Sequence, residues 1–107
     1  MKLTLDPAQW EAIATEAEAF LRSFASRHRL MVLCSLLDGE QSAGELGQRL
    51  GLTQSNLSRH LAVLRQEGLV ATRRQGTTIH YRIASERVRP ILTELYRLFC
   101  APPGTTS

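Results

Sequence analysis

The chain has 107 residues, 43% of them apolar, which suits one small hydrophobic core and predicts one domain over residues 1–107. Its formal charge is +3, and residues 53–82 hold five arginines against one glutamate, so we expect this half to bind an anionic partner. No apolar run is long enough to cross a membrane, and the first residues lack the apolar segment of a secretory signal. These observations exclude a membrane-spanning protein and a secreted protein, and they predict a soluble cytoplasmic one.

Two amphipathic helices are predicted first. Asp6 can cap a helix that runs to about Phe24. Ser26 can cap a second helix, which ends at Gly39 and carries Cys34 on its apolar face, so we expect this thiol to point inward. The apolar residues of the first helix recur three and four positions apart: Trp10, Ile13, Ala14, Ala17, Leu21 and Phe24.

Residues 42–67 predict a helix-turn-helix. Ser42 and Glu45 have the spacing of a capping box at the start of a short helix, which Gly51 ends. Thr53 can cap the next helix. Because only two residues separate these helices, they form the tight pair of a helix-turn-helix.

The hydrophobic period changes to two in residues 69–83, where a turn at Gln75-Gly76 predicts a β-hairpin. A last helix is predicted to start at Ser85. Pro90 falls close to that start, so either a kink or a later beginning near Arg89 is compatible with the sequence.

The predicted fold class is therefore mainly α with a small β-hairpin, a winged helix-turn-helix of about five helices and a two-stranded wing. Residues 1–25 and 85–100 are expected to form dimerisation helices, and residues 101–107, which are rich in proline and glycine, a flexible tail.

The helix that follows Thr53 is expected to present a polar face outward. The second helix of a helix-turn-helix enters the major groove by its N-terminal end, where amide, hydroxyl and guanidinium groups bond to base edges and phosphates. A solvated helix face is the ordinary alternative, but the capping box, the short turn and the basic hairpin in series favour DNA. The predicted DNA-binding residues are Thr53, Gln54, Ser55, Asn56, Ser58, Arg59, His60, Arg65, Arg73 and Arg74, with His60 in a supporting role.

Four segments carry a family resemblance: SAGEL at 42–46, LTQSNLSRHL at 52–61, GLV at 68–70, and RRQG at 73–76 followed by His80-Tyr81. Together they resemble the ArsR family of bacterial winged-helix repressors over about residues 26–100. The resemblance implies a homodimer, formed by the first and last helices, that binds a palindromic double-stranded operator and releases it when an inducer binds.

The nature of the inducer is a separate question. Many characterised members of the family sense metals, but soft metal sites need clustered thiolates or imidazoles. Cys34 has no second cysteine within two residues, and residues 88–100 contain no histidine. We therefore expect no metal and no other cofactor, with metal sensing kept as an alternative.

Cys34 and Cys100 resemble the sulfur-responsive subgroup typified by BigR, SqrR and HlyU, which has one cysteine at each of these places. The resemblance implies that persulfides or polysulfides bridge the two thiols and that the oxidised repressor leaves its operator, which derepresses genes of sulfide detoxification. Cys100, near the chain end and beside Arg97, is the better candidate for the attacking thiolate, and Cys34 would then resolve the intermediate.

Several alternatives stay open. Each cysteine alone is compatible with an ordinary buried or terminal thiol, and peroxide is an alternative oxidant for the pair. A winged-helix module that binds only other proteins, and not DNA, is another alternative function. An enzyme is not expected, because the chain has no CxxC pair and no histidine and carboxylate placed to activate a cysteine.

Overall fold

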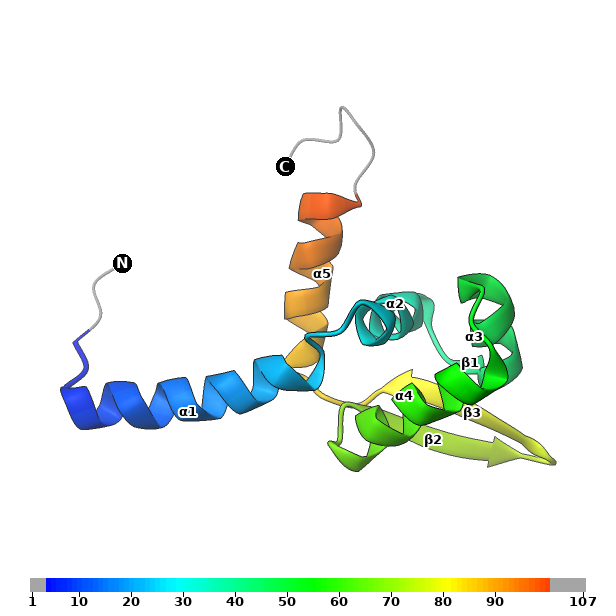
Figure 1. The fold of residues 1–107 in the computed structure, drawn as a ribbon, viewed down its shortest axis with the longest axis horizontal. Helices are drawn as coiled ribbons and strands as arrows, with labels where there is room; N and C mark the ends of the chain where they lie inside the picture. The colour runs from blue at the N-terminus through cyan, green and yellow to red at the C-terminus, as the bar shows by residue number, and fades with distance from the viewer. Residues whose placement is uncertain (1–3, 101–107) are drawn as a thin grey trace.

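The computed structural model describes residues 4–100, so the predicted tail at 101–107 lies outside the described residues. Among the described residues, each helix is too short or too polar to cross a bilayer. Figure 1 shows the arrangement of the elements, which are the helices α1 (Pro7–Ser23), α2 (Arg27–Ser35), α3 (Ala43–Leu50), α4 (Gln54–Gln66) and α5 (Val88–Phe99), the 3-10 turn η1 (Leu36–Asp38), and the strands β1 (Gln41–Ser42), β2 (Val70–Gln75) and β3 (Thr78–Ile83).

Side-chain caps start the helices where the sequence predicts them. The Asp6 carboxylate accepts the backbone N–H of Gln9 at 2.9 Å, and the Gln9 side chain accepts the backbone N–H of Asp6. Ser42 and Glu45 form the same reciprocal box at the start of α3. These bonds satisfy backbone donors that have no partner within the helix. Both predicted helix starts are confirmed.

The start of α5 differs from the prediction. The helix begins at Val88, whose backbone N–H donates to the Ser85 hydroxyl at 3.3 Å, and not at Ser85 itself. Pro90 is consequently the third helical residue, where a missing N–H costs no intrahelical bond. The later start, left open by the sequence, is the one that occurs.

Within residues 4–100 the sheet has three strands, whereas the sequence predicted two. The strand order is β1-β3-β2, all antiparallel, and Gln41 of β1 pairs with Tyr81 of β3. The β2–β3 hairpin forms as predicted, with Val70 opposite Ile83 and Gln75 opposite Thr78. The additional strand ties the start of α3 to the wing.

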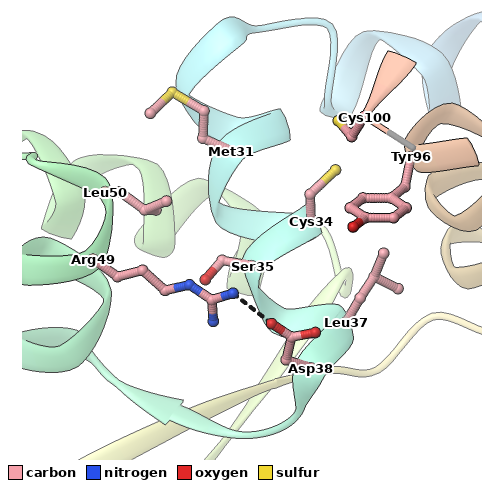
Figure 2. Close-up of a pocket in the computed structure, with 9 residues that line it drawn as sticks. All are labelled: Met31, Cys34, Ser35, Leu37, Asp38, Arg49, Leu50, Tyr96 and Cys100. Atoms are coloured by element: carbon pink, nitrogen blue, oxygen red, sulfur yellow. Dashed lines mark hydrogen bonds and ion pairs between the residues drawn. The ribbon is translucent and has the colours of Figure 1, made fainter. Parts of the chain in front are cut away.

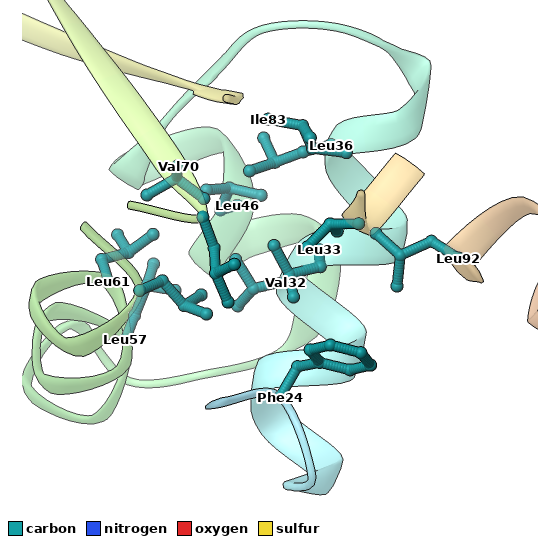
Figure 3. Packing of buried hydrophobic residues seen from close by; sticks show 13 residues of the cluster. Phe24, Val32, Leu33, Leu36, Leu46, Leu57, Leu61, Val70, Ile83 and Leu92 are labelled. Carbon is teal, nitrogen blue, oxygen red and sulfur yellow. The ribbon is translucent and has the colours of Figure 1, made fainter. Parts of the chain in front are cut away.

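The core lies between α2, α4, the base of the wing and the start of α5 (Figure 3). Val32 and Leu33 of α2 are completely buried, as are Leu57 and Leu64 of α4. Burial of this kind contributes about 1.5–3 kcal/mol for each large aliphatic side chain. The core therefore fixes α4 against α2 and leaves its opposite face to solvent.

Helices α1 and α5 extend away from this body (Figure 1). No residue of α1 is buried. Among residues 4–100, the large apolar side chains left exposed lie on these two helices: Trp10, Ile13, Leu21, Tyr96, Leu98 and Phe99. Phe99 is 80% exposed. Several large exposed apolar side chains on two helices of a small chain are typical of a protein interface.

Candidate DNA interface and thiol pocket

The outer face of α4 is polar and exposed, as expected. Thr53 caps the helix, since its hydroxyl accepts the backbone N–H of Asn56 at 3.3 Å. The buried face is formed by Leu57, Leu61 and Leu64. Among the predicted DNA-binding residues of this segment, Asn56 and His60 are half-buried, and the exposed ones are Thr53, Gln54, Ser55, Ser58, Arg59 and Arg65.

One hydrogen bond orients the arginine at the centre of this face. Arg59 Nη2 donates to Asn56 Oδ1 at 2.8 Å, one helical turn earlier. The long Arg59 side chain is thereby held against the surface of α4, which lowers the entropy that a DNA contact would cost. Asn56 therefore orients the Arg59 side chain in the absence of DNA.

Gly47 of α3 packs closely against the turn that leads into α4. A Cβ on Gly47 would lie 2.7 Å from Gln54 Nε2 and 3.3 Å from the Leu52 carbonyl oxygen. A side chain at position 47 would therefore require Gln54 to move and the Leu52 backbone to shift slightly, so glycine favours this close packing although it lowers the helical propensity of α3. The amide of Gln54 lies against α3 as a result.

The two predicted wing arginines have different surroundings. Arg73 Nε and Nη2 donate to the carboxylate of Glu40, with a shortest separation of 2.6 Å. Arg74 is exposed on the adjacent position of β2, opposite Ile79. The Arg73 guanidinium lowers the pKa of the Glu40 carboxyl, mainly through these hydrogen bonds. Arg73 thus links the wing to the loop before β1.

A histidine pair joins α4 to α2. The rings of His28 and His60 are 5.4 Å apart between centroids, at an interplanar angle of 61°. Partial burial lowers the pKa of His60, and the nearby positive charges of His28, Arg29 and Arg59 lower it further. The ring of His60 therefore contacts α2, and its supporting role in DNA binding stays a prediction.

A second feature is a pocket of ≈ 370 Å³ between α2, α3 and α5 (Figure 2). Both cysteines line it: Cys34 from α2 and Cys100 from the end of α5. Both are free thiols, Cys34 half-buried and Cys100 exposed. Residues that are 66 positions apart in the sequence thus face one cavity.

Burial raises the pKa of the Cys34 thiol, and the proximity of Cys100 raises it further. A thiol with a raised pKa is a poor nucleophile at neutral pH. The Arg97 guanidinium donates to Glu94, at 3.1 Å from Nε. The sequence suggested Arg97 as a neighbour that favours the Cys100 thiolate, but part of its charge is balanced by the Glu94 carboxylate.

The opposite side of the pocket carries a charged pair. Arg49, in the last turn of α3, donates to the carboxylate of Asp38 in η1. The remaining wall is largely apolar, with Met31, Leu37, Leu50 and Tyr96. The pocket therefore contacts the first helix of the helix-turn-helix through Arg49 and Leu50.

Among residues 4–100, no group of three or more His, Cys, Asp or Glu side chains is placed to hold a metal ion.

Asp38, Glu40 and Arg49 were not among the residues singled out from the sequence. Asp38 and Arg49 are 11 positions apart, and Glu40 and Arg73 are 33 apart. Helical and strand periodicity relate only near neighbours on one element. Only the third strand, which the sequence did not reveal, brings the Glu40 loop beside the wing.

Comparison with known proteins places the chain among bacterial regulators. Residues 26–72 match the family model described as "Bacterial regulatory protein, arsR family". The chain is 45% identical over 92 residues to the transcriptional activator HlyU of Vibrio cholerae, which covers 86% of this chain and 85% of that protein. It is 44% identical over 92 residues to the biofilm growth-associated repressor of Agrobacterium fabrum, covering 86% of this chain and 79% of that protein.

Solved structures agree with this result. Reduced HlyU from Vibrio cholerae superposes with a TM-score of 0.82 at 44% identity, covering 86% of this chain and 97% of that one. A homodimeric winged helix-turn-helix DNA-binding domain from Mycobacterium bovis superposes with a TM-score of 0.71 at 28% identity, covering 92% and 89%.

Proposed function

This chain belongs to the arsR family of bacterial regulatory proteins and is a DNA-binding transcriptional regulator, not an enzyme; on that premise we propose that it is a homodimeric repressor whose two cysteines sense persulfides and polysulfides. The observation that carries the proposal is the shared pocket of Cys34 and Cys100, which also contacts the end of α3. Bridging the thiols releases double-stranded operator DNA and derepresses genes of sulfide detoxification.

The DNA-binding face is the exposed side of α4 together with the wing. The α4 N-terminus enters the major groove, where Ser55, Ser58 and Arg59 reach base edges, while Arg65 and the wing arginines bind phosphates. In support of this assignment, these α4 side chains are exposed and the helix is held from behind by a buried leucine face.

Homodimerisation uses α1 and α5. Both helices expose large apolar side chains, which a second copy would bury. The Mycobacterium bovis relative is described as homodimeric. Two recognition helices in such a dimer would lie about one DNA turn, about 34 Å, apart on a palindromic site.

The sulfur chemistry has two steps. The Cys100 thiolate attacks the terminal sulfur of a persulfide RSSH; the S–S bond breaks, a thiolate RS⁻ leaves and takes up a proton, and Cys100 becomes a persulfide. The Cys34 thiolate then attacks the inner sulfur of that persulfide and expels hydrosulfide, which leaves a disulfide. If a further donor first extends the chain, the bridge contains more sulfur atoms. The exposure of Cys100 and the raised pKa of Cys34 support this order.

The bridge would act on DNA binding through the pocket walls. It ties α5, a dimer helix, to α2, and the same pocket contacts α3 through Leu50. A change in the angle between α5 and α2 would alter the separation of the two recognition helices. A coupling free energy of about 1–3 kcal/mol suffices to lower DNA affinity about 5- to 150-fold.

The test is a DNA titration before and after treatment with inorganic polysulfide, on a duplex enriched from a random library by the reduced protein. We expect a loss of affinity within the range above, reversed by a dithiol reductant, and no loss in Cys34→Ser or Cys100→Ser. If both single variants still respond, the thiol pair is not the sensor.

A peroxide sensor is the second candidate, because the same two thiols would form a disulfide through a sulfenic acid, with water as the product. Matched doses of peroxide and polysulfide separate the two cases. Mass spectrometry of the early product adds a second criterion, because only the sulfur donor can give a Cys100 persulfide or a bridge of more than two sulfur atoms, whereas a plain disulfide is common to both routes. A parallel arm with zinc or cadmium tests metal sensing.

A further inference from the structure

We infer that the thiol pocket selects persulfides of α-amino acids, with the ligand carboxylate on Arg49 and its ammonium group on Asp38. This inference rests on the proposed function and names the chemical class of the sulfur donor. It is carried by the placement of an ion pair and a thiol pair around one cavity.

The pocket has charges on one side and sulfur on the other. Figure 2 shows the sulfurs of Cys34 and Cys100 together and the Asp38–Arg49 pair across the cavity from them. The volume, ≈ 370 Å³, is near the lower end of the range of about 300–1,000 Å³ found for small-molecule pockets. The cavity therefore suits a ligand of amino-acid size that carries charge at one end and sulfur at the other.

The ion pair is available to a ligand. The side chains of Arg49 and Asp38 are 48% and 67% exposed. Exposed ion pairs contribute only about 0–1 kcal/mol, so that opening this pair costs little. A guanidinium then binds a carboxylate through two parallel hydrogen bonds, and a carboxylate accepts from an ammonium group. Inserting an α-amino acid replaces one charged contact by two.

The same pair discriminates between donors. Because the ion pair is neutral as a whole, it attracts neither a bare anion nor a bare cation. An anion that approaches Arg49 is repelled by the carboxylate of Asp38, and a cation that approaches Asp38 is repelled by the guanidinium of Arg49. Only a ligand with both charges on adjacent groups satisfies both residues. Inorganic hydropolysulfide, which has no such groups, gains nothing from the pair.

The bound donor would deliver its terminal sulfur to the thiols. The Cys100 thiolate attacks that sulfur, the donor S–S bond breaks, and the amino-acid thiolate leaves and takes up a proton. Cysteine persulfide is the simplest donor that meets these requirements. The leaving thiol keeps both charged groups, so it departs as an ordinary amino acid.

The experiment measures the rate of sulfur addition to Cys100 by mass spectrometry in the full-length reduced protein, with time points stopped by alkylation. Four donors are compared: cysteine persulfide, N-acetylcysteine persulfide without the ammonium group, cysteamine persulfide without the carboxylate, and inorganic polysulfide. The variants are Arg49→Gln and Asp38→Asn. The control pair is Arg22→Gln and Glu18→Gln, which makes the same charge changes in the exposed ion pair of α1.

In the wild type and in the α1 controls, cysteine persulfide should react about tenfold faster than either donor that lacks one charge. Arg49→Gln should abolish the advantage over cysteamine persulfide, and Asp38→Asn the advantage over N-acetylcysteine persulfide. The rate with inorganic polysulfide should be unchanged in both. Circular dichroism and DNA affinity of the reduced variants check that they fold.

Equal rates for all donors in the wild type would overturn the inference, and so would variants that slow every donor alike, since Arg49 and Asp38 would then act on the thiols and not on the ligand. Both of these results leave the proposed sulfur sensing intact. Failure of every donor to add sulfur to either cysteine would instead contradict the proposed function itself.

Discussion

Arg73 and Glu40 join the wing to the body of the protein across 33 positions of sequence, with both carboxylate oxygens bound to one guanidinium. The pair places a negative charge within the surface that is proposed to face DNA phosphates. Arg73 therefore cannot bind a phosphate without leaving Glu40 or sharing its donors with it. Arg74, on the next position of β2, has no such carboxylate described beside it among residues 4–100.

Glu40→Gln should strengthen DNA binding. The substitution removes one negative charge and frees Arg73, so that the slope of log affinity against log salt should steepen by about 0.9 for each phosphate newly bound. Fluorescence anisotropy on a random-sequence duplex measures this, because phosphate contacts do not depend on sequence. Glu11→Gln, which makes the same charge change on α1, is the matched control. An unchanged slope in Glu40→Gln would show that Arg73 stays out of the interface.

Arg59→Ala should weaken binding to an enriched duplex by about 1–3 kcal/mol and relax the preference at one base position of each half-site. The reason is that Arg59 is the arginine on the outer face of α4 whose orientation is fixed, through Asn56. Arg22→Ala on α1 removes the same charge elsewhere and serves as the control. Equal losses on enriched and random duplexes would mean that Arg59 contacts only phosphate.

The elements that the sequence predicted well are those set by local chemistry. Capping residues such as Asp6 and Ser42 act within three positions, and the leucine spacing of α4 repeats along one helix, so both can be followed in the sequence alone. The ArsR resemblance also depends on a contiguous run, and both the family and the winged helix-turn-helix fold are confirmed.

The features that the sequence did not reveal depend on distant parts of the chain. Strand β1 has two residues, too few for an alternating pattern, and it forms because Tyr81 and His80 of β3 offer it partners. The ion pairs of Glu40 with Arg73 and of Asp38 with Arg49 likewise join residues that are far apart in the sequence. The roles of the two thiols in sensing and of the α4 face in DNA binding remain predictions.

Cys100 should be alkylated before Cys34. Cys100 is exposed, whereas Cys34 is half-buried and its pKa is raised above the ordinary thiol value of 9.0, mainly by burial. Iodoacetamide reacts with the thiolate, so the rate at Cys34 should keep rising at pH values above 9.0. In Cys100→Ser the pKa of Cys34 should fall, since its second cause is removed, but stay above 9.0. Peptide mass spectrometry over a pH series measures both rates, and earlier modification of Cys34 would reverse the proposed order of attack.

The His28–His60 pair should make the protein less stable in mild acid. The pKa of His60 is lowered from 6.5 in the folded state, so below pH 6.5 the unfolded chain binds more protons than the folded one. The stabilisation is therefore present above pH 6.5 and is lost as the pH falls through the folded-state value. The Glu40 and Glu45 carboxyls, whose pKa values are lowered from 4.5, contribute their own losses only at more acidic pH.

Denaturant unfolding between about pH 5.5 and 7.5, at fixed protein concentration, isolates the histidine contribution. His60→Gln should flatten the decline in unfolding free energy over this range. His28→Gln should flatten it only in part, because it removes one of the positive neighbours of His60 and leaves the burial that is the larger cause. A decline that persists unchanged in His60→Gln would assign the acid sensitivity to another group.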